Sequence, residues 1–316
     1  MTETARTVLR HFEIRKSRKQ KEDFCVWLCE QLTAAGYAPK TETGGRLIES
    51  RNVVVGDPDG AELLLTAHYD TCAVLPFPNF ITPRNMPVYI LFNLAVCLPF
   101  LLVTTAAEIV MALLGAPLWL TMAAVYAILL LSLWLMLAGK ANRHTANDNT
   151  SGVMTLLEIA LTLPEKDREK ACFVFFDNEE KGLFGSAAFV KQHPKAKKEA
   201  LCLNFDCVSD GDDIQLYPMS TVKKDKHTAE KLQRAFRSAG DKRCEVVEGF
   251  AFYPSDQKHF RRGVGICALK KNRLVGYYMN RIHTPRDTVM DERNIELLRE
   301  SVLRFLAEEE KETYAG

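Results

Sequence analysis

Two long apolar stretches dominate the middle of the chain. Residues 87–107 and 109–139 contain no charged side chain, and Glu108 is the single charge between them. As helices, both stretches are long enough to cross the roughly 30 Å hydrocarbon core of a bilayer, which takes about 20 residues. Gly115-Ala116-Pro117 interrupts the second stretch with residues that favour a turn. The pattern therefore predicts two membrane-spanning helices joined by a tight connection.

We expect these helices to form a hairpin inserted at residues 81–140, with spans at about residues 87–110 and 118–138. The open end of the hairpin is flanked by Arg84, Lys140 and Arg143, whereas its tip has no basic residue. Because basic residues concentrate on the cytoplasmic side, both flanking parts of the chain are predicted to face the cytoplasm at the inner or plasma membrane. A buried pair of core helices is the alternative.

Outside the hairpin, short apolar runs of strand type alternate with segments of helical period. This order predicts a three-layer α/β/α domain with a mostly parallel mixed sheet, discontinuous over residues 1–80 and 141–316. The expected strands are residues 51–55, 62–67, 173–176, 200–205, 245–247 and 263–269. The expected helices are residues 19–35, 153–163, 183–192, 228–238 and 291–309.

The charge balance and the cysteine pattern exclude some functional classes. The 316 residues include 41 basic and 40 acidic side chains, so nothing indicates a nucleic-acid partner. The nine cysteines do not suggest a disulfide framework, and Cys25 and Cys29 lack a second pair or a nearby histidine for a zinc site. We interpret all nine as reduced, buried thiols. No apolar signal region precedes Phe24, which favours a cytoplasmic catalytic part.

Adjacent carboxylates follow one of the predicted strands. The run at residues 173–176 leads to Glu179-Glu180 and then to a turn at Gly182. Open α/β sheets place their chemistry at the carboxyl ends of strands. One carboxylate of such a pair can bind a metal while the other acts as a base. Alternatively, the pair simply favours the positive end of a helix.

Further metal-binding side chains follow other strands or lie in loops. The second strand ends at His68-Tyr69-Asp70, and a period of two puts His68 and Asp70 on the same side, so the carboxylate can orient the imidazole. Asp148 precedes the helix at residues 153–163, where a capped helix start is the alternative. Asp206 follows a strand, where a solvated strand end is the alternative, and His283 lies in the last loop.

Taken together, these segments resemble the co-catalytic di-zinc exopeptidases, which include bacterial leucyl aminopeptidases, aminopeptidase Y and glutamate carboxypeptidases. The resemblance covers about residues 20–75 and 141–310, through HYD, NDNTSG, FFDNEEKGLFGS, the strand ending in Asp206, and IHTPRDT. It implies two Zn²⁺ ions and a peptide or amide substrate, cleaved by a metal-activated water. The roles that it implies are Asp148 as the bridge, His68 and Asp206 on one zinc, Glu180 and His283 on the other, Glu179 as general base, and Asp70 as the carboxylate behind His68.

The substrate remains open at this stage. An aminopeptidase is the default of the family, and the adjacent hairpin makes a hydrophobic peptide or N-acyl amide from the bilayer plausible. A carboxypeptidase needs a cation, for which Arg273, Arg281 or Arg286 are available. A glutaminyl-cyclase-like acyl transferase, a class that typically uses one zinc, and a catalytically silent membrane scaffold are the other candidates.

Several side chains near the motifs have weaker assignments. Tyr277 and Tyr278 are candidates either for holding the tetrahedral intermediate or for core packing. Ser255-Asp256 resembles a family loop that lines the pocket. The remaining histidines have no such context, and we expect surface or packing roles for them: His144, His193, His227 and His259.

Overall fold

In the computed structural model, which describes residues 1–46 and 48–313, a mixed sheet forms the centre of the molecule. Its strand order is β1-β2-β4-β3-β5-β8-β6-β7, with β9 paired to β8. Neighbours from β4 through β3 and β5 to β8 run parallel, whereas β1-β2, β2-β4, β8-β6 and β8-β9 are antiparallel. The strands are β1 Lys40–Gly44, β2 Ser50–Val55, β3 Leu63–His68, β4 Ala171–Phe176, β5 Leu201–Phe205, β6 Asp213–Pro218, β7 Arg243–Val246, β8 Arg262–Asn272 and β9 Gly276–Tyr278.

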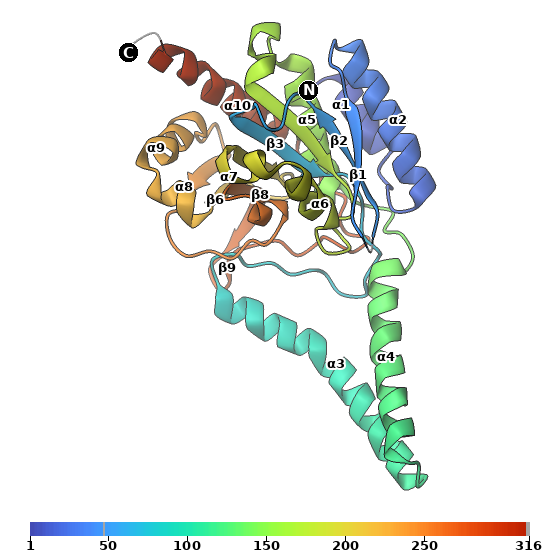
Figure 1. Ribbon diagram of the computed structural model, residues 1–316. Coiled ribbons are helices and arrows are strands. Elements are labelled where there is room, and N and C mark those ends of the chain that lie inside the picture. Colours follow the sequence, from blue (N-terminus) through green and yellow to red (C-terminus); the bar gives the residue numbers. More distant parts are fainter. Residues whose placement is uncertain (47, 314–316) are drawn as a thin grey trace.

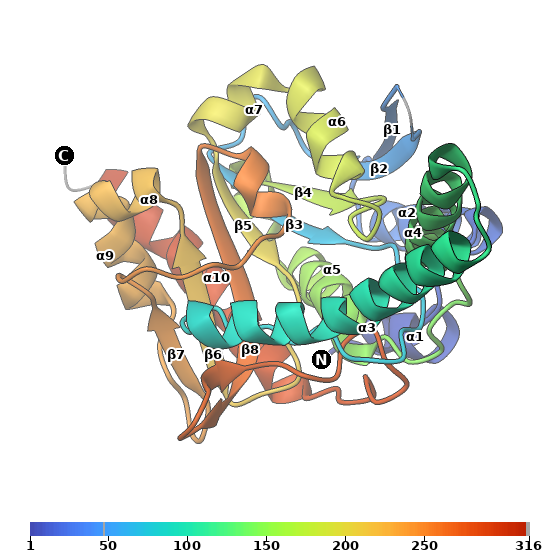
Figure 2. The ribbon, with the colours of Figure 1, turned by 90° about the horizontal axis from the view of Figure 1, so that it is seen from below.

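Helices cover both faces of this sheet (Figures 1 and 2). Alternate residues of one strand, such as Phe173 and Val174, belong to different apolar clusters because successive side chains point to opposite faces. One face packs against α1 Glu3–His11, α2 Arg18–Ala34, α5 Gly152–Thr162, α8 Ser220–Lys224, α9 Lys226–Ala235 and α10 Glu292–Thr313. The other packs against α6 Phe184–Gln192 and α7 Pro194–Glu199. The predicted three-layer α/β fold is therefore confirmed.

The apolar stretches form two helices, α3 Met86–Leu113 and α4 Leu118–Ala138. They project from the α/β domain and meet at a turn where Gly115 has a φ of +68°, a left-handed value that glycine adopts readily (Figure 1). In each helix, no residue of the most apolar window is buried. A buried core pair is therefore wrong, and both helices are long and apolar enough to span a membrane. The first continues three residues past its predicted end at residue 110.

Backbone contacts fix the base of the hairpin to the α/β domain. The segments that enter and leave it form an antiparallel bridge between Ala73 and Ala141, and the amide of Val74 donates to the carbonyl of Lys140 at 2.9 Å. Ile81 forms a second bridge, to Met279 beside β9. These contacts hold the base of the hairpin next to the segments that follow Asp70 and precede His283.

The predicted helices and strands all form, with ends shifted by a few residues, but some elements were missed. These are β1, β6, β9, α1, α7 and α8. The cysteine prediction is also partly wrong. All nine are free, yet Cys29 and Cys244 are only partly buried and Cys97 is exposed on α3. A cysteine on an apolar helix that projects from the domain has no core to enter.

Candidate metal centre

The five predicted ligands lie together at one edge of the sheet. Because β3, β4 and β5 are parallel neighbours, their carboxyl ends meet there and carry His68, the Glu179-Glu180 pair and Asp206. Asp148 comes from the Ala146–Ser151 segment that leads into α5, and His283 comes from the loop before α10. Segments far apart in sequence therefore deliver five donor groups to one place.

Asp148 stands between two groups of donors. One of its oxygens, Oδ1, lies 3.4 Å from His68 Nε2, which is itself 3.5 Å from Asp206 Oδ1. The other oxygen, Oδ2, lies 3.1 Å from His283 Nε2, which is 3.3 Å from Glu180 Oε2. Donors about 2.1 Å from a tetrahedral zinc are about 3.4 Å apart, so both groups have the spacing of a zinc ligand set.

Two buried carboxylate oxygens in this cluster accept no hydrogen bond from the part of the protein that the structure describes. Among the described residues, Glu180 Oε1 and Asp206 Oδ1 are buried and accept no hydrogen bond. Asp70, Asp148 and Asp206 are all nearly inaccessible to solvent. Buried negative charge is costly unless cations compensate it. The donor set therefore fits divalent cations, and carboxylate with neutral imidazole is a typical zinc environment.

The electrostatic environment of the cluster perturbs its titrating groups strongly. Burial opposes the charging of His68 and His283, but the surrounding carboxylates, with Glu179 first for His68 and Glu180 first for His283, raise the pKa of both imidazoles well above normal. Burial raises the pKa of the Glu179 carboxyl well above normal; His68 opposes this rise, and Asp206 and Asp256 add to it. Glu179 is thus a carboxylate with increased affinity for a proton.

Asp70 holds the predicted glutamate pair as well as His68. The Nδ1 of His68 lies 3.1 Å from the backbone carbonyl of Asp70 and 3.6 Å from its carboxylate. That carboxylate accepts the backbone amides of Glu179, at 2.9 Å, and Glu180, at 3.3 Å. Asp70 therefore fixes the turn after β4, a contact that the spacing of HYD did not indicate.

The polar residues around Asp148 hold the loop in place. Asp287 accepts the amides of Asn147 and Asp148 at 2.8 and 3.0 Å. Asn147 accepts the amides of Ser209 and Asp210, and Asn149 donates to the carbonyl of Phe205 at 2.9 Å. Hydrogen bonds between the NDNTSG and IHTPRDT motifs thus hold the two segments together. The polar residues in both motifs were the signal that could have indicated these contacts.

Basic side chains behind the strand ends were missed. Arg15 is fully buried and donates to the backbone carbonyls of Phe12 and Tyr69 and to Thr150 Oγ1. Lys21 binds Asp177 at 2.6 Å, next to the glutamate pair. The contacts of Arg15 with Tyr69 and Thr150, and of Lys21 with Asp177, join residues far apart in sequence, so no motif predicts them.

The side chains with weaker assignments are mostly engaged elsewhere. Tyr278 packs near Phe80 and Tyr277 under the guanidinium of Arg84, which favours packing at the hairpin base. Arg281 pairs with Asp210 at 3.3 Å.

The remaining histidines also have partners away from the ligands. His193 lies between Glu42 and Asp59, and His144 lies beside Glu13. His259 Nδ1 is 2.8 Å from Ser186 Oγ, which also donates to Asp256. The predicted pocket loop lies beside the end of β5, because the side-chain amide of Asn204 donates to Ser255 Oγ at 3.0 Å.

A cavity of about 190 Å³ opens beside Glu180 and His283. Its wall includes Met136 and Leu137 from the last turn of α4, together with Lys16. The Lys16 ammonium donates to the carbonyl of Leu137 at 2.6 Å. One end of the apolar hairpin therefore forms part of the opening to the candidate metal centre.

Comparison with known proteins defines the class. Residues 135–306 match peptidase family M28, and the chain belongs to that family. It is thus a member of a peptidase family, and its carboxylate and imidazole donor set supports zinc as the metal. No curated protein sequence matches significantly.

Solved structures share the fold across nearly the whole chain. Porphyromonas gingivalis glutaminyl cyclase matches with a TM-score of 0.61 at 19% identity, covering 97% of both chains. A Zn-dependent exopeptidase from Parabacteroides distasonis matches with 0.57 at 16%, covering 96% of this chain and 94% of that one. A leucine aminopeptidase precursor from Bacteroides thetaiotaomicron matches with 0.58 at 15%, covering 96% and 95%. At such low sequence identities, the structural similarity establishes only that the fold is shared.

Proposed function

We propose that the protein is a membrane-anchored di-zinc aminopeptidase that hydrolyses peptide or amide bonds. The observation that supports this proposal most directly is the position of Asp148, whose two oxygens face different histidines at 3.4 and 3.1 Å. A carboxylate that bridges two cations requires this arrangement. His68 and Asp206 would hold one zinc, and Glu180 and His283 the other. When bound, zinc supplies Lewis-acid chemistry that polarises the scissile carbonyl and acidifies water.

Glu179 has the position and environment of the general base. Its carboxylate lies within 4.8 Å of donor atoms of His68 and Asp206, and Asp70 holds its backbone amide. Burial and the neighbouring carboxylates raise the pKa of Glu179, so its ionised form is a stronger base for taking a proton from the attacking water. As the carbon–nitrogen bond breaks, Glu179 passes that proton to the leaving amine. This transfer completes the hydrolysis.

The hairpin supports a membrane location and a substrate that comes from the bilayer. Met136 and Leu137 of α4 line the cavity beside Glu180, so the apolar side chain of a substrate can pass from lipid to the site along the hairpin. Arg84, Lys140 and Arg143 lie at the open end of the hairpin. We infer that residues 87–138 contact the bilayer and that the catalytic domain faces the cytoplasm.

Zinc analysis and a substrate panel test the activity. We expect two zinc ions per purified chain and release of the N-terminal residue from peptides and aminoacyl amides, more efficiently for hydrophobic substrates. Carboxyl-terminal and N-acyl amide substrates in the same panel test the neighbouring specificities. A chain that binds two zinc ions but cleaves only N-acyl amides would contradict the aminopeptidase assignment and retain the metal site.

A glutaminyl-cyclase-like acyl transferase is the second candidate. It is favoured by the similarity in fold to Porphyromonas gingivalis glutaminyl cyclase. In that reaction the α-amine of an N-terminal glutamine attacks its own side-chain amide carbon, and ammonia leaves. Mass spectrometry of a peptide with N-terminal glutamine distinguishes the two outcomes: ammonia loss indicates cyclisation, whereas loss of a whole residue indicates hydrolysis.

Membrane attachment has a separate test. Alkaline carbonate should leave the full-length protein in the membrane pellet, and a reporter fused at Gly316 should read out as cytoplasmic. Release of intact protein into the carbonate supernatant would refute anchoring. A periplasmic or lumenal readout would refute the orientation alone.

A further inference from the structure

Cys72 differs from the other buried cysteines in its surroundings. It lies four residues after the end of β3 and is 3% exposed. The other buried cysteines pack within apolar clusters of the described chain: Cys25, Cys172, Cys202, Cys207 and Cys267. Cys72 belongs to none of these clusters. A buried thiol usually serves as a small apolar side chain within a core cluster, and Cys72 lies outside all three clusters.

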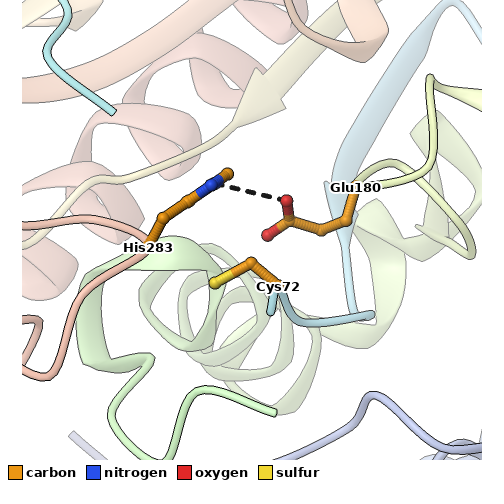
Figure 3. Close-up of side chains that lie close together, drawn as sticks. All are labelled: Cys72, Glu180 and His283. Atoms are coloured by element: carbon orange, nitrogen blue, oxygen red, sulfur yellow. Dashed lines mark ion pairs between the residues drawn. The ribbon is translucent and has the colours of Figure 1, made fainter. Parts of the chain in front are cut away.

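The Cys72 thiol instead faces two of the proposed zinc ligands. Its sulfur, a carboxylate oxygen of Glu180 and a ring nitrogen of His283 all lie within 4.8 Å of one another (Figure 3). They converge from three separate segments of the chain. Cys72 also lines the same cavity as Glu180 and His283. A tetrahedral zinc with one sulfur ligand needs donors about 3.4 to 3.6 Å apart, so the three donors would have to draw together around an ion.

The unsatisfied oxygen of Glu180 also points to a ligand beside this triangle. The Glu180 side chain is only 9% exposed, and its Oε2 faces His283 at 3.3 Å. Its other oxygen, Oε1, is buried and has no hydrogen-bond partner among the described residues. A buried carboxylate oxygen left without a donor is costly, and a bound cation removes that cost.

The backbone holds the three side chains in this arrangement. The amide of Leu75 donates to the carbonyl of His283 at 2.8 Å, which fixes the segment of Cys72 against the histidine loop. The carbonyl of Cys72 accepts the amide of Asn142 at 3.2 Å, at the base of the hairpin. Asp70, two residues earlier, accepts the amide of Glu180. Hydrogen bonds to the backbone therefore hold the three segments that carry Cys72, Glu180 and His283 next to one another.

We propose that Cys72 is a ligand of the zinc held by Glu180 and His283, an inference that rests on zinc binding in the proposed function. As the sulfur–zinc bond forms, the thiol proton leaves to water in the cavity. Cys72 would add a sulfur donor to the nitrogen of His283 and the oxygen of Glu180, the two residues with which its sulfur is grouped. The zinc at His68 and Asp206 keeps only nitrogen and oxygen donors.

The sulfur makes the two metal positions unequal. Thiolate is a soft ligand that favours zinc over manganese or magnesium, whereas carboxylates accept all of them. The position with Cys72 should therefore keep zinc longer against a chelator and resist exchange with manganese. Cys207, whose sulfur lies near Asp148 and Asp206, packs in an apolar cluster and is the natural comparison.

The first test is the absorption spectrum of the full-length protein with cobalt in place of zinc. A cobalt–thiolate bond adds a charge-transfer band in the near ultraviolet that imidazole and carboxylate ligands do not produce. We expect this band in the wild type, its loss in Cys72→Ser and Cys72→Ala, and its retention in Cys207→Ala and in the core control Cys202→Ala. A band that survives Cys72→Ser, or that disappears only in Cys207→Ala, overturns the proposal.

The second test measures zinc retention during titration with a chelator. The wild type should lose one zinc before the other, and Cys72→Ser should release the second at a chelator concentration lower by at least about tenfold. Circular dichroism and the core control establish that the variants fold. Two-zinc binding without any thiolate signature overturns the Cys72 assignment and leaves the peptidase proposal standing. Failure of the folded wild type to bind zinc or cobalt overturns both.

Discussion

Glu179 and Glu180 are neighbours in sequence, but their side chains occupy different parts of the site. Both backbone amides donate to the Asp70 carboxylate, so the turn is fixed through the backbone. From this turn the Glu180 carboxylate reaches His283 at 3.3 Å, whereas the Glu179 carboxylate lies near His68 and Asp206. One peptide unit thus separates a proposed metal ligand from a proposed base.

Substituting each glutamate by glutamine should separate these roles. Glu180→Gln removes a charged donor, so zinc content and turnover should both fall. Glu179→Gln preserves size but removes the base, so zinc should stay bound while turnover falls by about 100- to 10,000-fold. Zinc analysis and rate measurements on both variants check this. A Glu179→Gln protein that turns over normally, or that loses its zinc, would show that the pair is misassigned.

His193 gives the structure a pH-dependent contact away from the site. Its ring nitrogens lie 2.9 Å from Glu42 and 3.0 Å from Asp59. Burial alone would lower the pKa of His193, but these carboxylates raise it overall. Because the pKa is higher in the folded state, the stabilisation is full below the unfolded value of about 6.5 and is lost as pH rises through the folded value.

The His193→Gln variant should therefore be destabilised more in acid than in base. We expect a loss of no more than about 1 kcal/mol at about pH 5.5, because the partners are partly exposed, and a smaller loss at about pH 9. Denaturation of wild type and variant at both pH values measures the difference. An equal loss at both would indicate that packing, rather than charge, is the contribution of His193.

At the scale of elements, the Ala146–Ser151 segment connects the ends of two strands. The amide group of Asn149 donates to the carbonyl of Phe205 at the end of β5 and to that of His68 at the end of β3, and its oxygen accepts the amides of Gly152 and Cys207. A single side chain thus positions the segments that carry three proposed ligands.

Asn149→Ala should loosen this connection. Each buried group left unpaired costs roughly 1–3 kcal/mol, so the melting temperature should fall by roughly 5 °C or more. Zinc affinity should fall as well, because the strand ends carrying His68 and Asp206 lose their common tether. Asn272→Ala is the matched control, since Asn272 accepts one exposed amide, that of Leu274. Thermal melting with and without chelator provides the measurement, and equal melting of the two variants would contradict this role.

The sequence predicted those elements that form mainly because of their own residues. It missed those that depend on contacts with distant parts of the chain. Strands buried on both faces, such as β3 and β4, are continuous apolar runs and were predicted. The edge strand β1, Lys40–Gly44, is polar and mostly exposed, and only its pairing with β2 makes it a strand. In the same way, motif residues placed the proposed ligands at strand ends, whereas Arg15 reaches its partners only through the tertiary fold.

In the molecule as a whole, the hairpin and the candidate metal centre share one region of the surface. Figure 1 shows the hairpin leaving the α/β domain on the side opposite to the N-terminal end and to α10. The cavity beside Glu180 is lined by Met136 and Leu137 of α4, and the bridge between Ala73 and Ala141 closes the hairpin base next to it. We expect a membrane around the hairpin to lie directly below the opening of the site.

Replacing Met86–Ala138 by a short Gly/Ser linker tests whether the hairpin delivers substrate in addition to anchoring the enzyme. The linker leaves both base bridges in place, at Ala73 and Ile81, so the α/β domain should fold and keep its zinc. Activity on small soluble substrates should stay within a few-fold of the wild type, whereas activity on hydrophobic substrates in vesicles should fall much more. A control that fuses the linker form to an unrelated membrane anchor separates tethering from access. Full recovery with that anchor would limit the hairpin to tethering, and equal loss on both substrate types in a folded, zinc-loaded protein would contradict the access role.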